Sequence, residues 1–393
     1  AISVPAQALL DVPVSVSVHG LPPGARTTLT ATARDAHGTT WTSSAQFQAT
    51  ATGAISLQQP SLAGSYTGSQ PMGLFEFMAP PAGDLTSRYF QQPETGYDVT
   101  LVASVGGRRV ASATTHRQTW QQAGVTKRQL RPAADKVYGE LFSPADTGTR
   151  HPAVLVFGGS EGGLSMGFAA GILAAHGYPA LSLAYFKEPG LPPSLADVPL
   201  EYFTRALALL RRQPGVDPKH VLVFGVSRGS EAALLLGSHF PRLVNGVIAG
   251  VPSSVVNPGY PNPARSAWTL GGKPVPAITR EEWTDTSPAD PRAVIAVERI
   301  RGPVLLACGL QDQIWPSCVY QDAIASRLTS HHFGYRVIDL RYPDAGHDVG
   351  GMNAIFSATA IDFPHGGSLA GNQAALADSH AQLLSFLAAQ DAG

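Results

Sequence analysis

Two stretches of the sequence have the pattern Gly-x-Ser-x-Gly, in which a serine can act as a nucleophile. They are GVSRG at 225–229 and GGSEG at 158–162. The first lies between an apolar run, HVLVFGV (220–226), and a helical segment, SEAALLLG (230–237). A strand, a sharp turn and a helix form the setting of a nucleophile elbow, where the glycines keep side chains off a strained turn. We therefore predict that Ser227 is the nucleophile.

The second stretch follows another apolar run and is suited to a different task. Its glycines would let backbone N–H groups approach a substrate closely. An oxyanion hole takes one donor from the residue after the nucleophile and one from an earlier strand-to-helix loop. This rule assigns the N–H of Arg228 and the backbone of Gly159 and Ser160. Two alternatives remain, a turn that only opens a helix and a phosphate site at a helix start, but the spacing fits neither a P-loop nor a dinucleotide fingerprint.

A serine nucleophile needs a histidine base, and the base needs a carboxylate that orients it. In this chain order the acid follows the serine and the histidine comes last. Asp312 follows the apolar run PVLLACGL (303–310), and His347 follows YRVIDLRYP (335–343). Open α/β sheets carry their sites at the carboxyl ends of strands. The predicted triad is therefore Ser227, His347 and Asp312.

Other histidines and carboxylates fit the triad less well. The chain has 12 histidines, and a surface or packing role is expected for His331, His332, His365 and His380. Asp344 and Asp348 flank His347, but residues so close in sequence rarely point at the imidazole ring. A metal site built from these three residues has no recognised ligand spacing. We predict neither a metal nor a cofactor.

The elements that must position these residues change character near residue 130. Up to residue 118, Val, Thr, Leu and Ala alternate with a period of two, which predicts an all-β sandwich of immunoglobulin-like size. The stretch 120–136 has no clear period and separates the two parts, giving domains at 1–130 and 131–393. The strands expected in the first domain are 14–20, 27–35, 39–49, 73–79, 97–105 and 108–117.

Beyond the boundary, continuous apolar runs alternate with helical segments. Buried strands covered by helices on both faces indicate a doubly wound, mostly parallel α/β sheet. The strands expected here are 137–142, 152–159, 179–186, 220–226, 244–251, 303–310 and 335–343. The expected helices are 166–177, 200–215, 230–240, 318–328 and 372–390. The Pro- and Gly-rich loop 252–295 is expected to border the substrate pocket.

Composition argues against several classes of protein. Lys and Arg (27) nearly balance Asp and Glu (28), so no overall field favours nucleic acid. No apolar stretch is long enough for a membrane span. The chain start lacks the pattern of a signal peptide, which favours a cytoplasmic location, although a start at Ala1 also fits removal of a signal. The two cysteines show no zinc or scaffold spacing, and a disulfide between Cys308 and Cys318 stays possible.

Longer motifs resemble the acyl-CoA thioesterase and bile acid-CoA:amino acid N-acyltransferase family over nearly the whole chain. They are DVPVSVSVHGLPPG, LAGSYTGSQPMGLFEFM, LVFGGSEGGLS, FGVSRGSEAALLL, LQDQIWPS and YPDAGHDVG. The resemblance implies an immunoglobulin-like domain followed by an α/β-hydrolase domain, with Ser227, Asp312 and His347 on the triad positions. It also implies activity on acyl thioesters of coenzyme A. Members of this family that form amides use a cysteine nucleophile, so a serine favours hydrolysis.

The function expected first is hydrolysis of an acyl thioester through an acyl-serine intermediate. An acyltransferase or cyclase comes second, because an amine or alcohol could replace water in the same site. A carboxylester or lactone hydrolase and a non-enzymatic binding protein are the further alternatives. The expected partner is a small-molecule acyl thioester or ester. Lysines are few in this chain, so a phosphate site would have to use arginine. The chain has only Lys127, Lys136, Lys187, Lys219 and Lys273.

Overall fold

The computed structural model describes residues 1–82, 89–145, 148–353, 355 and 365–391. These residues form two compact units. The first contains Ala1–Ala123, and the second contains Gly124–Asn353 with the segment that ends in the C-terminal helix.

The first unit is rich in β-structure, as the period-two alternation predicts. Its larger sheet pairs β4 (Arg26–Arg34) with β5 (Thr40–Gln48) and with β8 (Tyr97–Val105), all antiparallel. β9 (Arg108–Gln118) continues the sheet, and β2 (Gln7–Leu9) and β7 (Ala63–Gly64) form its edges. A second sheet contains β1 (Ile2–Ser3), β3 (Ser17–Val18) and β6 (Ile55–Ser56). The predicted all-β class is confirmed.

One predicted strand of this unit is wrong. The segment 73–79 begins with a short helix, α1 (Gly73–Glu76), instead of a strand. Leu74 and Phe75 are neighbours and both fully buried, which a strand with one face in water cannot achieve because its side chains alternate. A short apolar run does not distinguish a strand from a buried helical turn by its period.

The second unit contains an eight-stranded sheet in the order β10-β11-β13-β12-β15-β16-β19-β20. β10 (Thr126–Leu130) and β11 (Tyr138–Ser143) are antiparallel at one edge. The other strands run parallel to one another. They are β12 (His151–Phe157), β13 (Ala180–Ala184), β15 (Val216–Val226), β16 (Val247–Gly250), β19 (Val304–Gly309) and β20 (Val337–Tyr342). The doubly wound α/β prediction is confirmed.

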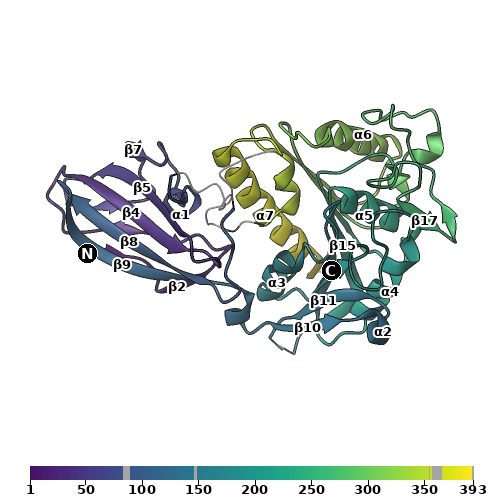
Figure 1. Ribbon diagram of the computed structural model, residues 1–393, viewed down its shortest axis with the longest axis horizontal. Coiled ribbons are helices and arrows are strands. Elements are labelled where there is room, and N and C mark those ends of the chain that lie inside the picture. Colours follow the sequence, from purple (N-terminus) through teal and green to yellow (C-terminus); the bar gives the residue numbers. More distant parts are fainter. Residues whose placement is uncertain (83–88, 146–147, 354, 356–364, 392–393) are drawn as a thin grey trace. The chain divides into compact units, whose positions relative to one another are not determined.

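Helices cover both faces of this sheet (Figure 1). α3 (Gly167–Ala175) and α7 (Leu369–Asp391) lie on one side, and α4 (Leu200–Leu210) and α5 (Arg228–His239) lie on the other. α6 (Ser317–Ser330) packs near β19 and β20. The core between these layers is made almost wholly of Val, Leu, Ala and Phe. Among the described residues, no helix has both the length and the apolar character needed to cross a bilayer.

The stretch that the sequence leaves without a period contains three short elements. They are a 3₁₀ turn at Trp120–Ala123, strand β10 and helix α2 (Pro132–Asp135). β10 pairs with β11, so it belongs to the sheet of the second unit. Four of its five residues are exposed, which explains why no apolar pattern marks it. The domain boundary near residue 130 stays a prediction.

Further short elements decorate the second unit. β14 (Val198–Pro199), β17 (Trp268–Leu270) and β18 (Lys273–Pro274) form a small separate sheet. Single 3₁₀ turns occur at Pro291–Ala293, Val297–Arg299 and His347–Gly351. The last of these, η4, follows β20 and carries the predicted base, His347.

Candidate active site

Ser227 occupies a strained turn between the end of β15 and the start of α5. Its φ is 56° and its ψ is −122°, a left-handed conformation that is costly for a residue with a side chain. The turn is fixed by the hydrogen bond from Ser227 N–H to Gly250 O, at 2.9 Å. Non-glycine residues held in such conformations cluster at functional sites. The serine is therefore presented in the manner of a nucleophile elbow.

The two motif glycines permit this turn through close backbone contacts. A Cβ at Gly225 would lie 2.0 Å from Gly229 O, and a Cβ at Gly229 would lie 2.3 Å from Gly158 O. Both distances are far below van der Waals contact, and the obstructing atoms are backbone. Any larger residue at either position would displace the elbow or the loop after β12. The two glycines thus leave the space that the turn and the neighbouring loop need, as the motif predicts.

The predicted acid and base are in contact. His347 Nδ1 lies 2.8 Å from Asp312 Oδ2, and their side chains are 11% and 2% exposed. Asp312 also accepts hydrogen bonds from Ser317 Oγ at 2.6 Å and from Ile314 N–H at 2.9 Å. Because both oxygens have donors, the carboxylate is held in one orientation. It fixes the imidazole with the proton on Nδ1, which leaves Nε2 free to act as a base.

The loop that carries His347 packs against the strand ends beside Ser227. A Cβ at Gly350, in the same 3₁₀ turn, would lie 2.6 Å from Val251 and 3.1 Å from Val226. The Trp315 ring lies 6.0 Å from the His347 ring, and its indole N–H donates to Val251 O. The described residues show no hydrogen bond between Ser227 and His347. Catalytic hydrogen bonds are often long before substrate binds.

The glycine-rich loop after β12 lies against the serine. A Cβ at Gly159 would lie 2.8 Å from Ser227 Cβ and 3.2 Å from its Oγ. The Gly159 N–H donates to Glu161 Oε1 at 2.9 Å, so a carboxylate already occupies this predicted oxyanion donor. The Ser160 N–H has no acceptor among the described residues. Arg228 is the first residue of α5, where N–H groups have no partner within the helix.

Tyr185 supports this loop from below and is a residue that the sequence did not single out. Its hydroxyl lies 2.8 Å from Gly158 O and 3.1 Å from Gly159 O. Burial, reinforced by the charge of Glu161, holds the pKa of Tyr185 well above its ordinary value of 10. The phenol therefore stays a donor at all physiological pH values. A tyrosine that ends an apolar strand carries no signal of such a contact.

A buried carboxylate, Glu231, joins the elbow helix to the long loop. It accepts from Arg228 Nε at 3.1 Å, from Asn257 Nδ2 at 3.0 Å and from Trp268 Nε1 at 2.5 Å. Burial raises the pKa of Glu231, and Arg228 is the largest of the interactions that oppose the rise. Its charged form is thus held by several donors on separate segments. The sequence missed this group because its partners come from distant positions.

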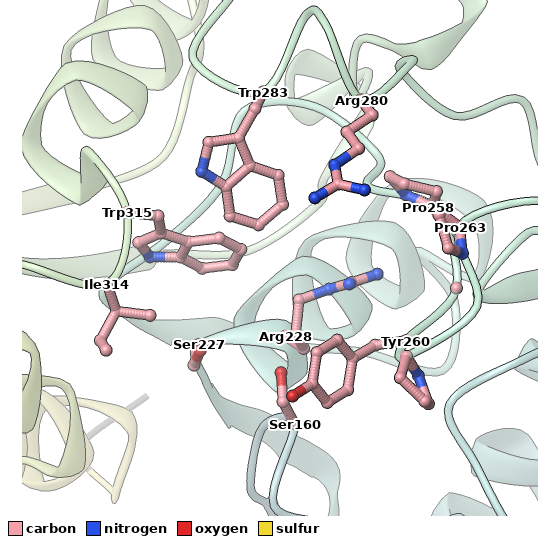
Figure 2. A pocket seen from close by; sticks show the side chains of 12 residues that line it. Ser160, Ser227, Arg228, Pro258, Tyr260, Pro263, Arg280, Trp283, Ile314 and Trp315 are labelled. Carbon is pink, nitrogen blue, oxygen red and sulfur yellow. The ribbon is translucent and has the colours of Figure 1, made fainter.

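A pocket opens directly above the serine, with a volume of about 660 Å³. Figure 2 shows Trp283, Trp315 and Ile314 on one side and Tyr260, Pro258 and Pro263 on another. Arg280 and Arg228 point into it from above and below in the same view. Most of this wall comes from the loop 252–295, which the sequence placed at the pocket. An apolar chamber over a serine suits an acyl group.

A disulfide between Cys308 and Cys318 encloses the acid loop. Its Cα atoms are 5.2 Å apart, and it links the end of β19 to the start of α6. Asp312 and Trp315 lie within the closed segment. The sequence left this bond open, and the structure contains it.

The alternative residues are placed elsewhere. Asp348 bonds His365 Nδ1 at 2.8 Å, and Asp344 is 3.4 Å from the Gln311 amide, so neither carboxylate bonds His347. His380 is buried in α7, with Nδ1 3.0 Å from Met352 O. The remaining pair, His331 and His332, follows α6. No ligand set forms around His347 in the described part of the chain.

This chain is similar to known proteins over most of its length. The family model described as the acyl-CoA thioester hydrolase/BAAT N-terminal region matches residues 11–132. The model described as the BAAT/acyl-CoA thioester hydrolase C terminal matches 198–265 and 273–389. Acyl-coenzyme A thioesterase 6 of Mus musculus is 32% identical over 349 residues, which is 86% of this chain and 82% of that protein.

Two rat proteins are similarly related. Acyl-coenzyme A amino acid N-acyltransferase 2 of Rattus norvegicus is 31% identical over 366 residues, covering 88% of this chain and 85% of its own length. The mitochondrial acyl-coenzyme A thioesterase 2 of Rattus norvegicus is 31% identical over 356 residues, covering 86% and 76%. The relatives thus include enzymes that pass an acyl group to water and one that passes it to an amino acid.

Proposed function

Because the chain belongs to the acyl-CoA thioester hydrolase/BAAT family, we propose that it hydrolyses acyl thioesters through an acyl-serine intermediate. The single observation that carries the proposal is the strained Ser227 at an apolar pocket, with a histidine that a buried carboxylate orients on a turn packed against the adjoining strand ends. The coenzyme A ester of a carboxylic acid is the proposed substrate. The triad proposed from the sequence is retained.

In the first half of the reaction, His347 Nε2 takes the proton from Ser227 Oγ as the oxygen attacks the thioester carbonyl. Backbone N–H groups of Ser160 and Arg228 donate to the oxyanion of the tetrahedral intermediate. Loss of one such donor costs about 10²–10³ in rate in comparable sites. The C–S bond then breaks, the thiolate receives the proton from His347, and an acyl ester of Ser227 remains.

In the second half, water replaces the thiol. His347 removes a proton from water, the hydroxyl oxygen attacks the ester, and the proton returns to Ser227 Oγ as the acid leaves. Gly159 can add a third oxyanion donor only when Glu161 releases its N–H. Tyr185 positions the loop by holding the two carbonyls beneath it.

A second candidate function is transfer of the acyl group to an amine. The observation in its favour is the 31% identity to an amino acid N-acyltransferase. The chemistry differs only in the acceptor that attacks the acyl-serine. A carboxylester or lactone substrate would use the same residues and is the third candidate.

The test is a panel of acyl-CoAs and simple esters, with free thiol and product mass followed together. Thiol release with formation of free acid, lost in Ser227→Ala, supports the proposal. The matched control is Ser160→Ala, in which the backbone N–H is kept and thiol release persists. Turnover of esters without thioesters contradicts the proposal, and an amide product in the presence of amino acids favours transfer.

The cytoplasmic location expected from the sequence stays a prediction. The disulfide between Cys308 and Cys318 bears on it, because such bonds persist mainly in oxidising compartments. The test is to count free thiols in protein isolated from its natural cell before any exposure to air. Two free thiols indicate a reducing compartment such as the cytoplasm, and none indicates an oxidising one.

A further inference from the structure

The pocket above Ser227 carries positive charge although the whole chain does not. Two of its lining residues are arginines, and none is acidic. The net charge of the chain is −1, so an arginine pair without lining acids is a local feature. The rest of the wall consists mainly of proline, tryptophan and other apolar groups. Charges facing an apolar wall interact more strongly than charges in open water.

Arg228 is already engaged in the fold. It is 4% exposed, it pairs with Glu231, and its Nη2 donates to Asn257 O at 3.0 Å. Its charge is thus balanced by a buried carboxylate, and its donors serve the elbow and the loop. Arg228 is thus a structural group, and its charge is offset by Glu231.

Arg280 has no such commitment. It is exposed, and it forms no hydrogen bond or ion pair with the residues that the structure describes. Figure 2 shows its guanidinium extending from the upper side of the view into the space between Trp283 and Pro258. A guanidinium is always charged and presents a planar fork that matches two oxygens of a carboxylate or phosphate. The Arg280 guanidinium is therefore available to pair with an anionic group of the substrate.

We propose that Arg280 binds an anionic oxygen group of the substrate and makes the enzyme selective for thioesters that carry one. The inference rests on the proposed thioester hydrolysis and names the feature that the site recognises. The anion has two possible sources, the phosphates of a coenzyme A-type thiol and a carboxylate at the far end of the acyl group. Both share the chemistry of a guanidinium with two oxygens.

Three substrates of equal chain length separate these sources. Hexanoyl-CoA carries phosphates, hexanoyl-N-acetylcysteamine carries no charge, and the adipoyl thioester of N-acetylcysteamine carries only a distal carboxylate. The measured quantities are two ratios of kcat/KM, each taken relative to the uncharged thioester. In Arg280→Gln we expect one ratio to fall by about tenfold or more, as loss of a charge-assisted contact implies. Arg280→Lys keeps the charge but not the planar fork, so we expect its ratio to lie between those of the wild type and Arg280→Gln.

The matched control is Arg301→Gln, which removes one exposed arginine outside the pocket. Arg301 lies just before the amino end of β19, whereas Asp312 of the site follows the carboxyl end of that strand. A fall in the hexanoyl-CoA ratio, beyond the control, identifies the phosphates. A fall in the adipoyl ratio identifies the carboxylate. If neither ratio changes more than in Arg301→Gln, the proposal is overturned.

A binding measurement separates this inference from the proposed function. Calorimetry with free coenzyme A and with adipate needs no turnover. If the wild-type protein hydrolyses no thioester but binds one of these anions more tightly than Arg280→Gln does, thioester hydrolysis fails and the anion site stands. The opposite outcome has three parts: the wild-type protein hydrolyses thioesters, both kcat/KM ratios of Arg280→Gln match those of Arg301→Gln, and neither anion binds the wild type more tightly than Arg280→Gln. In that case the anion site is wrong and thioester hydrolysis is supported.

Discussion

A buried carboxyl in the first unit makes the stability of that unit depend on pH. Glu76 belongs to α1, is 6% exposed, and has a pKa raised by burial from 4.5 to about 7. The folded chain therefore keeps this proton over a pH range in which the unfolded chain loses it. Below about pH 4.5 both states hold the proton, so the full stability is present. As pH rises through 7, stability is lost.

The size of this loss follows from the shift. About 2.5 pKa units correspond to about 3 kcal/mol of unfolding free energy between acidic and alkaline conditions. Glu76→Gln keeps the shape and removes the ionisation. Because pH 5 lies slightly above the ordinary pKa of 4.5, part of the loss has already occurred there, and we expect the difference in unfolding free energy between about pH 5 and about pH 8.5 to shrink by about 2.5 kcal/mol in the variant.

The assay must report on the first unit. Urea denaturation of the whole chain at both pH values, read by amide exchange of peptides from β4 and β8, provides this after correction for intrinsic exchange rates. Glu94→Gln makes the same chemical change at an exposed position of the same unit and serves as the control. An unchanged pH dependence in Glu76→Gln would mean that burial does not hold the proton on Glu76.

Three further predictions concern the second unit. Asp312→Asn should lower kcat by about 10³–10⁴ at unchanged fold, because the amide cannot fix the His347 tautomer; steady-state kinetics with circular dichroism checks it. Tyr185→Phe should lower kcat by about tenfold with little change in KM, because it loosens the glycine-rich loop after β12 without touching substrate. A change confined to KM contradicts this prediction. Replacing both cysteines by alanine should lower the unfolding free energy by about 3 kcal/mol for so short a closed loop, as denaturant titration measures, and equal stability of the two proteins speaks against a formed disulfide.

The parallel sheet was predictable because its signal is local. Fully buried strands read as continuous apolar runs, and the seven runs expected beyond residue 130 each overlap a strand of the eight-stranded sheet. Their carboxyl ends could then be searched for polar residues. This is how Asp312 and His347 were brought together, 35 residues apart in the chain and 2.8 Å apart in space.

Groups whose partners come from several segments were not predictable. Glu231 reads as an ordinary helix residue, yet it binds Arg228, Asn257 and Trp268. The exposed strand β10 has no apolar pattern because it lies at the sheet edge. The mistaken strand at 73–79 arose because two consecutive buried residues in so short a run fit either structure. Local periodicity does not contain these tertiary facts.

The proposed mechanism requires that Ser227 carries the acyl group during turnover. Rapid acid quenching with an acyl-CoA, followed by mass spectrometry of the intact protein and its peptides, measures this directly. An acyl-serine intermediate predicts one added acyl mass on the peptide that contains Ser227, absent from Ser227→Ala and lost as free acid appears. Turnover of the thioester with no acylated protein at any time, or acylation of a different residue, would contradict it.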